Sequence, residues 1–244
     1  MRKLVALVLS LILLASCLPG MAEEASFVVR NGDREKKQVA ITIDDCFNLE
    51  MAQRAYDLSV QYNVPITFFV LGIKLQEEDA ALWHAIAESH NEIGNHTYGH
   101  ISLAELTPRQ IYTQLTKTQE ALDRVLGYHY PMQVFRPPYG HLNRNGKKHV
   151  NAAVQAVGYD HGVLWDISQT DFDKCYPQVQ NGSILLFHTN KKDLKCIEQL
   201  IPRLLEDGYE LVTVSEMLGK EPVATSTDLY TYIDYVDWQA AQGS

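Results

Sequence analysis

The chain has 244 residues, of which 46% are hydrophobic and 21% are charged, a composition typical of a globular protein. Its length fits a single α/β barrel domain. The formal net charge of −9 argues against nucleic acid as a partner, because binding to phosphates requires clustered lysines and arginines and the sequence contains no such stripe.

The N-terminus has the pattern of a secretory signal peptide, which we assign to residues 1–22. Two basic residues precede the apolar run Leu4–Leu14, which is too short to span a bilayer. Two cleavage sites compete. The segment Leu14–Cys17, "LASC", is similar to a lipobox and would leave a lipid anchor at Cys17 as the only membrane contact, whereas Gly20–Ala22, "GMA", suits ordinary signal peptidase. Both predict an exported protein, either secreted or held at the cell envelope.

The rest of the chain is predicted to form a linker over residues 23–36 and one domain over residues 37–219. In this domain short β-like runs alternate with amphipathic helical segments. The runs predicted as strands are Val39–Ile43, Ile66–Val70, Glu92–Gly94, Val134–Arg136, Gly162–Trp165, Ile184–Phe187 and Glu210–Val214. Such alternation predicts a mostly parallel sheet covered by helices, and seven strands would close into a (β/α)7-type barrel of the α/β class.

Two helices have clear sequence signals. At Thr107 the sequence "TPRQ" offers an N-cap, a proline at the first helical position and a glutamine three residues after the cap. A second apolar periodicity runs from Leu194 to Glu206 and stops near Gly208. Pro202 lies inside it and should kink this helix or mark its true start.

After export, Cys46, Cys175 and Cys196 remain. An oxidising compartment permits disulfides, and Cys175 and Cys196, which flank one predicted strand, are the expected pair. The alternative is that all three cysteines stay reduced and buried. The acidic, aromatic tail, residues 220–244, either packs back across the domain or extends away from it. We expect the protein to be a monomer.

Reactive side chains follow five of the predicted strands. In chain order they are Asp44 and Asp45, His96 and His100, Arg136 and Tyr139, Asp166 and Asp171, and finally His188. In an α/β barrel the active site lies at the carboxyl ends of the strands. We therefore expect these side chains to meet at one rim of the barrel.

At these positions the chain resembles the polysaccharide deacetylases of carbohydrate esterase family 4, the NodB-homology group. Five motifs occur in the order of that family: "TIDDC", "HTYGH", "RPPYG", "DISQTDF" and "LFH". The resemblance covers roughly Lys37–Gly219. It implies a distorted (β/α) barrel and a hydrolase that removes acetyl groups from N-acetylglucosamine units of a cell-wall or chitin-like polysaccharide. The chain departs from the family at Cys46, where the motif usually has glycine.

Asp45, His96 and His100 form the metal site that this resemblance implies. One carboxylate and two imidazoles suit Zn²⁺ with coordination positions left open, and Co²⁺, Ni²⁺ or Mn²⁺ are alternatives. Because His96 and His100 lie four residues apart, one helical turn would present both on the same side.

The family resemblance also implies the catalytic groups. Asp44 matches the general base and Arg136 would pair with it, holding it ionised. His188 is the candidate general acid that protonates the departing amine, because histidine can hold a proton near neutral pH. Asp171 matches the family position of the carboxylate that keeps this histidine charged.

Three further residues are expected around the substrate. The backbone N–H at Tyr139 would donate a hydrogen bond to the oxyanion, as it does in the family. Leu186 and Trp165 would form the wall of a pocket for the acetyl methyl group. The alternative for these two is an ordinary place in the core.

Several other functions are compatible with parts of the pattern. An O-acetyl xylan esterase of the same family differs only in substrate. An iron oxygenase also uses two histidines and one carboxylate, but Asp44 beside the ligand and the lack of a cosubstrate motif argue against it. A non-catalytic carbohydrate-binding envelope protein is the third alternative, which the presence of both Asp44 and His188 argues against.

Overall fold

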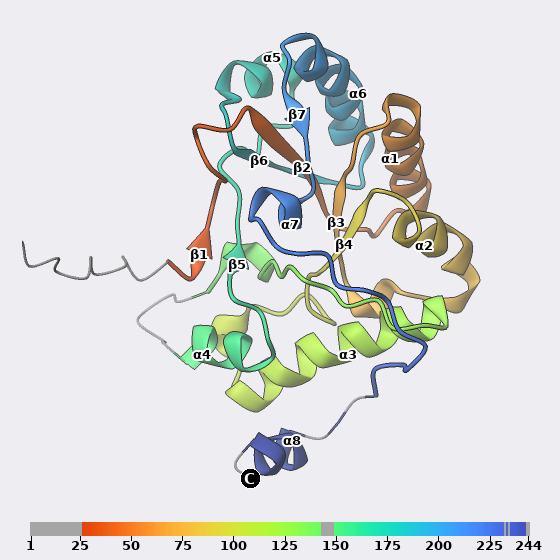
Figure 1. Ribbon diagram of the computed structural model, residues 1–244, viewed down its shortest axis with the longest axis vertical. Helices are drawn as coiled ribbons and strands as arrows, with labels where there is room; N and C mark the ends of the chain where they lie inside the picture. Colours follow the sequence, from red (N-terminus) through yellow and green to blue (C-terminus); the bar gives the residue numbers. More distant parts are fainter. Residues whose placement is uncertain (1–25, 143–148, 232, 234, 243–244) are drawn as a thin grey trace, which may run out of the picture.

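The structure is a computed structural model that describes residues 26–142, 149–231, 233 and 235–242. The strands lie in the centre and the helices surround them (Figure 1). The strands are β1 (Val28–Val29), β2 (Gln38–Asp45), β3 (Thr67–Val70), β4 (Glu92–Asn95), β5 (Gly162–Val163), β6 (Ser183–His188) and β7 (Glu210–Leu211). The helices are α1 (Leu49–Tyr62), α2 (Ala80–Ala87), α3 (Pro108–Leu126), α4 (His149–Ala156), α5 (Phe172–Cys175), α6 (Lys191–Glu206), α7 (Val214–Met217) and α8 (Tyr235–Gln242). The predicted signal peptide, including Cys17, lies outside the described residues.

The strands pair in parallel and form a closed, irregular ring. The order β4-β3-β2-β6 forms the main path, β7 pairs with the start of β2, and β1 pairs with β5. Single bridges complete the ring: Phe135 links Asn95 of β4 to Gly162 of β5, and Ile167 links the segment after β5 to Leu185 of β6. The prediction of an α/β barrel in a single domain is therefore confirmed.

Two predictions about strands were wrong. Val134–Arg136 is not a strand, because only Phe135 bridges its neighbours. Prolines at positions 131, 137 and 138 surround this segment, and proline has no N–H to donate to a ladder. Conversely, the predicted linker at residues 23–36 contains β1, whose two β-branched valines pair with Gly162 and Val163.

Helices α3 and α6 begin at side-chain caps. The Thr107 hydroxyl accepts a hydrogen bond from the Gln110 backbone N–H, and the Gln110 side chain accepts one from Thr107, so the predicted capping box is confirmed. Helix α6 begins at Lys191, three residues before the predicted start, because the Asn190 side chain accepts hydrogen bonds from the backbone N–H groups of Lys192 and Asp193. Pro202 lies inside this helix and does not mark its start.

The cysteines are free thiols in the described part of the chain, so the predicted disulfide between Cys175 and Cys196 is absent from the structure. The prediction did identify neighbours, since Cys175 of α5 and Cys196 of α6 interact and belong to the same apolar cluster. Both are fully buried among apolar side chains, where a thiol packs as a small hydrophobic group.

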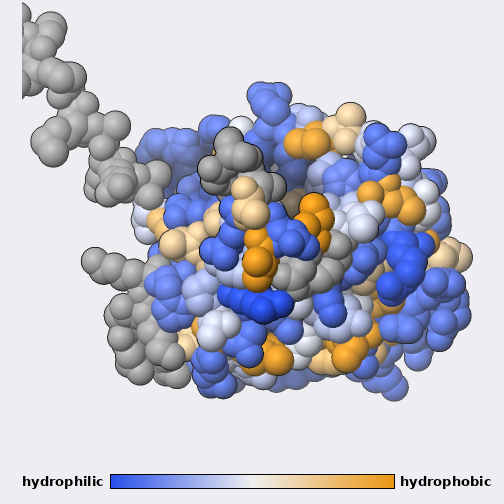
Figure 2. Space-filling model, turned by 90° about the horizontal axis from the view of Figure 1, so that it is seen from below, coloured by the Kyte–Doolittle hydropathy of each residue, from blue (hydrophilic) through white to orange (hydrophobic). Residues whose placement is uncertain are grey.

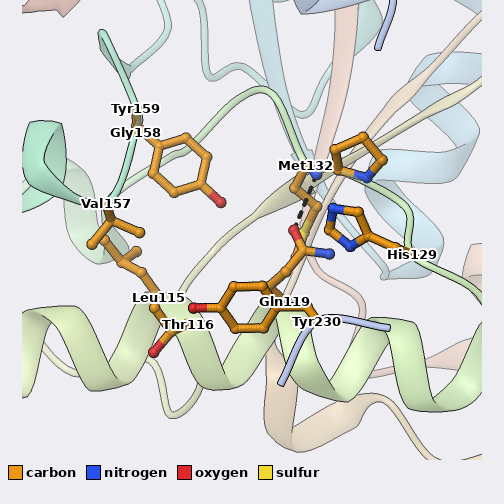
Figure 3. A pocket seen from close by; sticks show the side chains of 10 residues that line it. Leu115, Thr116, Gln119, His129, Met132, Val157, Gly158, Tyr159 and Tyr230 are labelled. Carbon is orange, nitrogen blue, oxygen red and sulfur yellow. Dashed lines mark hydrogen bonds between the residues drawn. The ribbon is translucent and has the colours of Figure 1, made fainter. Parts of the chain in front are cut away.

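The C-terminal tail packs back onto the domain, the first of the two alternatives. Ser226 pairs with His129, the backbone N–H of Tyr230 donates to Asp123, and α8 packs Tyr235 and Trp238 against Tyr112 of α3. The Tyr230 ring closes one side of a cavity of about 190 Å³ between α3 and the segment after α4 (Figure 3). Viewed from the α8 end, the surface is mostly hydrophilic, with apolar side chains scattered over it (Figure 2).

No helix in the described ranges is both long enough and apolar enough to cross a bilayer.

Glu92, at the start of β4, is a buried carboxylate whose hydrogen-bond donors are neutral groups. It accepts hydrogen bonds from the Thr67 and Ser215 hydroxyls and from the Ser215 backbone N–H. Burial raises its pKa above the ordinary value of 4.5, although these hydrogen bonds lower it in part. Folding thus favours the protonated form, and this contribution to stability is lost as the pH rises through the folded-state pKa.

We therefore expect Glu92→Gln to change the pH dependence of stability. The stability of the wild type relative to the variant should be highest below about pH 4.5 and should decline toward neutral pH. At neutral pH the wild type must either keep Glu92 protonated or bury its charge, and both cost free energy, whereas glutamine stays neutral. Thermal unfolding of both proteins across this range measures the difference. The exposed Glu78→Gln is the matched control and should show no such trend. A constant difference between wild type and Glu92→Gln would contradict the assignment.

Candidate active site

Most of the predicted reactive side chains meet at the carboxyl ends of the strands, but Asp166 and Asp171 do not. Asp166 lies at the start of β6, where it accepts hydrogen bonds from Arg34 and the Ser183 hydroxyl. Asp44 and Asp45 are the last two residues of β2, and His188 is the last residue of β6, directly opposite Asp44 in the sheet register. His96 and His100 follow β4. Arg136 follows the bridging residue Phe135, whose neighbours in the ring are β4 and β5.

Asp45, His96 and His100 form a cluster whose ligand atoms all lie within 4.8 Å of one another. Oδ1 of Asp45 is 3.5 Å from Nε2 of His96 and 3.3 Å from Nε2 of His100. This oxygen is buried and has no hydrogen-bond partner within the structure. A buried carboxylate oxygen without a donor is costly, and a cation held jointly with the two imidazoles would satisfy it. The donor set therefore fits a divalent metal.

Both histidines direct Nε2, the nitrogen that would bind a metal, toward Asp45. The Nδ1–H of His96 donates to the backbone carbonyl of Arg136 over 2.8 Å, which leaves the lone pair of Nε2 facing Asp45. Burial lowers the pKa of His100 below its usual value, although Asp45 raises it in part. Burial by itself would raise the pKa of Asp45, but the adjacent imidazoles, His96 foremost, bring it below its usual value.

The segment that presents the two histidines is a loop, so the prediction of a helical turn was wrong. Thr97 and His100 both have left-handed backbone conformations, with φ of 72° and 56°. The loop is held by side chains: Asn95 Oδ1 accepts from the Thr97 N–H, and Thr97 Oγ1 accepts from the His100 N–H. These local hydrogen bonds replace the helical ones.

Backbone strain is concentrated at this rim. Among the described residues, six non-glycine residues have positive φ, and all but Asn63 are at this site: Asp45, Cys46, Thr97, His100 and Tyr139. Such conformations cost of order 1–3 kcal/mol each and cluster at functional sites. At Cys46, φ is 54°, which explains the glycine that the family places there. The Cys46 side chain points into the apolar core and is not one of the candidate metal ligands.

The Asp44 carboxylate lies between Arg136, with which it pairs, and the candidate metal ligand His96. Nη1 of Arg136 donates to Oδ1 of Asp44 over 2.7 Å and to the Thr42 hydroxyl over 2.6 Å. The guanidinium is completely buried, and its other N–H groups donate to the carbonyls of Val163 and Leu164. Oδ2 of Asp44 lies 3.7 Å from Nε2 of His96. One oxygen of Asp44 is thus fixed by Arg136, and the other faces the candidate metal ligands.

The carboxylate beside His188 is Asp193, so the predicted pairing with Asp171 was wrong. Asp193 Oδ2 accepts a hydrogen bond from the His188 backbone N–H over 2.7 Å and lies 3.5 Å from the ring Nδ1. The contact with Asp193 is the largest cause that raises the pKa of His188 above its usual value. Asp171 is exposed, precedes α5 as its N-cap, and lines a surface hollow with Lys192 and Lys195.

The three residues expected around the substrate lie near this rim. Tyr139 is 57% exposed, and its ring packs edge-on against His100 with centroids 4.5 Å apart. Its φ of 60° places it in a sharp turn within a short 3-10 helix, Pro138–Gly140. The Trp165 ring lies beside Gly140 and 5.6 Å from the Arg136 guanidinium carbon. Leu186 is buried on β6. A hollow of about 440 Å³ adjoins the cluster, lined in part by His100, Ile101 and Tyr139.

Two supporting groups were missed in the sequence. Thr42 alternates with the core residues of β2 and looks like a routine strand residue, although its hydroxyl accepts from Arg136 and donates to the Leu185 carbonyl. Asp193 lies within the first turn of α6, where acidic residues are common. A signal for Asp193 was available: the capping residue Asn190 starts the helix only two residues after His188 and carries Asp193 back to the end of β6.

Comparisons with known proteins agree with this geometry. The family model described as polysaccharide deacetylase matches residues 31–161. The peptidoglycan-N-acetylmuramic acid deacetylase PdaC of Bacillus subtilis is 30% identical over 76% of this chain and 39% of its own length. A peptidoglycan-N-acetylglucosamine deacetylase of Bacillus cereus is 32% identical over 77% of this chain and 70% of its own length.

Among solved structures, the Bc1960 peptidoglycan N-acetylglucosamine deacetylase superposes with a TM-score of 0.70 at 28% identity, covering 80% of this chain and 94% of that one. The chain spans only about 40% of the length of several curated relatives, PdaC among them. The segment matched by the family model nevertheless covers more than half of this chain, and it contains Asp44, Arg136 and the three candidate metal ligands. On that basis the chain belongs to the polysaccharide deacetylase family.

Proposed function

We propose that this protein is a metal-dependent hydrolase that removes acetyl groups from N-acetylglucosamine units of peptidoglycan. The observation that supports it most is the Asp45 Oδ1 atom, which is buried without a donor and faces two imidazoles. Beside it stands a second carboxylate, Asp44, fixed by a buried arginine. One acid that binds a cation and one that accepts a proton are what amide hydrolysis by water requires.

The metal would be held by Asp45, His96 and His100, and we propose Zn²⁺ from the ligand types. When bound, such an ion lowers the pKa of a coordinated water toward ~7 and polarises the acetamide carbonyl. Asp44 would accept the proton of the attacking water through the oxygen that Arg136 leaves free. Arg136 would keep Asp44 ionised and prevent its rotation, because its guanidinium is locked by two backbone carbonyls.

On the other side of the cluster, His188 would donate a proton to the departing amine. It lies opposite Asp44 across the β2–β6 pair, so the base and the acid flank the reacting group. The backbone N–H of Tyr139 would donate to the oxyanion, and Trp165 and Leu186 would exclude water around the acetyl methyl group.

The surface around the cluster suits a glycan. Exposed apolar side chains stand on successive loops of the rim: Phe47 after β2, Ile73 after β3, Ile101 after β4, and Tyr139. Sugar rings present apolar C–H faces, and aromatic side chains offer flat apolar area with little loss of conformational entropy. Two of the relatives named above are peptidoglycan deacetylases. An exported location, inferred from the N-terminal segment, would bring the protein to such a substrate.

The test is acetate release from three polymers: peptidoglycan, chitooligosaccharides and acetyl-xylan. We expect release from peptidoglycan, loss of activity after treatment with a chelator, and recovery when Zn²⁺ is restored. The reason is that attack by water would depend on the cation held by Asp45, His96 and His100. Preferential release from acetyl-xylan would instead assign an O-acetyl esterase. Binding to glycans without any release would assign a non-catalytic envelope protein.

A further inference from the structure

Asp193 occupies an unusual position beside the proposed general acid. It lies in the first turn of α6 and is only 1% exposed. Its Oδ2 atom accepts a hydrogen bond from the backbone N–H of His188 over 2.7 Å, and the same oxygen is 3.5 Å from Nδ1 of the ring. The carboxylate therefore contacts both the main chain and the side chain of His188.

The charge of Asp193 has one cationic partner. A buried carboxylate must be paired or must lose its charge. Among the ion pairs of the described residues, Asp193 is joined to His188 and to no lysine or arginine. The helix dipole also favours a negative charge here, since Asp193 lies at the N-terminus of a sixteen-residue helix. An ionised Asp193 is thus best balanced by a protonated His188.

The other charged groups that face His188 are Asp44 and Asp45 at the end of β2. These would be engaged by Arg136 and by the metal, respectively, which leaves Asp193 as the uncommitted carboxylate. Lys192 and Lys195 lie on a different face of α6, where they line the hollow that also contains Asp171. Asp171 therefore belongs to a separate, solvated set of charges.

We propose that Asp193 is the positioning residue of the general acid in this chain, in place of the carboxylate at Asp171 that the family pattern implies. Through its contact with Nδ1, it orients the ring so that Nε2 is directed to the departing amine, and it balances the charge of the imidazolium. This inference rests on the proposed function, because it assigns a partner to the acid of that reaction.

The decisive comparison is Asp193→Asn against Asp171→Asn in the full chain. For Asp193→Asn we expect kcat for acetate release to fall by up to about 10²–10⁴-fold, the range for a general acid. KM and bound metal should be unchanged, since neither ligand nor glycan surface is altered. The alkaline limb of the pH profile should move to lower pH, because the amide no longer favours the protonated imidazole. Asp193→Glu should recover part of the rate, and Asp171→Asn should behave as the wild type.

A second measurement separates this inference from the proposed function. NMR titration of the His188 ring in the metal-loaded chain should give a lower pKa in Asp193→Asn than in the wild type and in Asp171→Asn. This readout needs a folded protein but no turnover. If the wild-type protein released no acetate, the proposed function would be contradicted, but the His188 titration would still test the role of Asp193. A His188 titration that responds to Asp171→Asn and not to Asp193→Asn would overturn the assignment of Asp193.

Discussion

Asp44→Asn should retain its metal and lose most of its turnover, whereas Asp45→Asn should lose both together. Asparagine at position 44 has a similar volume and leaves Asp45, His96 and His100 in place, but its amide cannot accept the proton of water. Loss of a general base typically costs about 10²–10⁴-fold in rate. Asparagine at position 45 removes the charged oxygen that faces both imidazoles, so affinity for the cation should drop.

The measurement is metal content and acetate release for both variants, with His96→Ala as the reference for a disrupted site. Excess Zn²⁺ should restore part of the activity of Asp45→Asn and none of that of Asp44→Asn. If Asp44→Asn released its metal while Asp45→Asn kept metal and activity, the two roles would be reversed. Full activity in both variants would show that the proposed mechanism is wrong.

Arg136→Met is expected to cause the largest loss of stability among the changes considered. The guanidinium is completely buried, pairs with Asp44 at 2.7 Å, and donates to two carbonyls. Removing one partner of a buried ion pair leaves an uncompensated charge and costs about 3–5 kcal/mol. For a domain of this size that corresponds to a Tm lower by roughly 6–20 °C. Thermal unfolding of the metal-free protein measures the effect directly.

The double variant Asp44→Asn, Arg136→Met isolates the ion pair. Because it removes both charges, it should be less destabilised than the sum of the single variants, and the difference gives the coupling energy. Activity should be lost in all three proteins. If the loss of unfolding free energy in the double variant equalled the sum of the two single losses, the positions would not be coupled. That result would contradict the loss of the Asp44–Arg136 pair as the source of the destabilisation.

The sequence by itself predicted the candidate metal ligands and the candidate base, with the role of each taken from the family resemblance. Asp44 and Asp45 come directly after one predicted strand, and His96 and His100 lie in the segment that follows another. Parallel strands of a barrel place their carboxyl ends at one rim. Capping residues likewise determined the start of α3, since Thr107 and Gln110 are neighbours in the chain and satisfy each other locally. In such cases the interacting groups are close in sequence or are placed by the regular geometry of a strand.

Only the tertiary structure decided what lies next to His188. The family resemblance assigned Asp171 to this position, and Asp193 was not among the candidates. The choice depends on how α6 packs after β6: its capped first turn brings Asp193 against the backbone of His188, while Asp171 stays at the surface. The burial of Asp193 and the direction of α6 after its capped start at Asn190 decided this contact.

The same holds for the loop that presents His96 and His100. Their spacing of four suggested a helical turn, but Asn95 and Thr97 hold the backbone in a strained, left-handed path instead. Local spacing cannot reveal such strain, because the surrounding barrel supplies the contacts that stabilise it. The sequence therefore predicted most of the residues that meet at this rim, and the packing of the barrel decided their conformation and their partners.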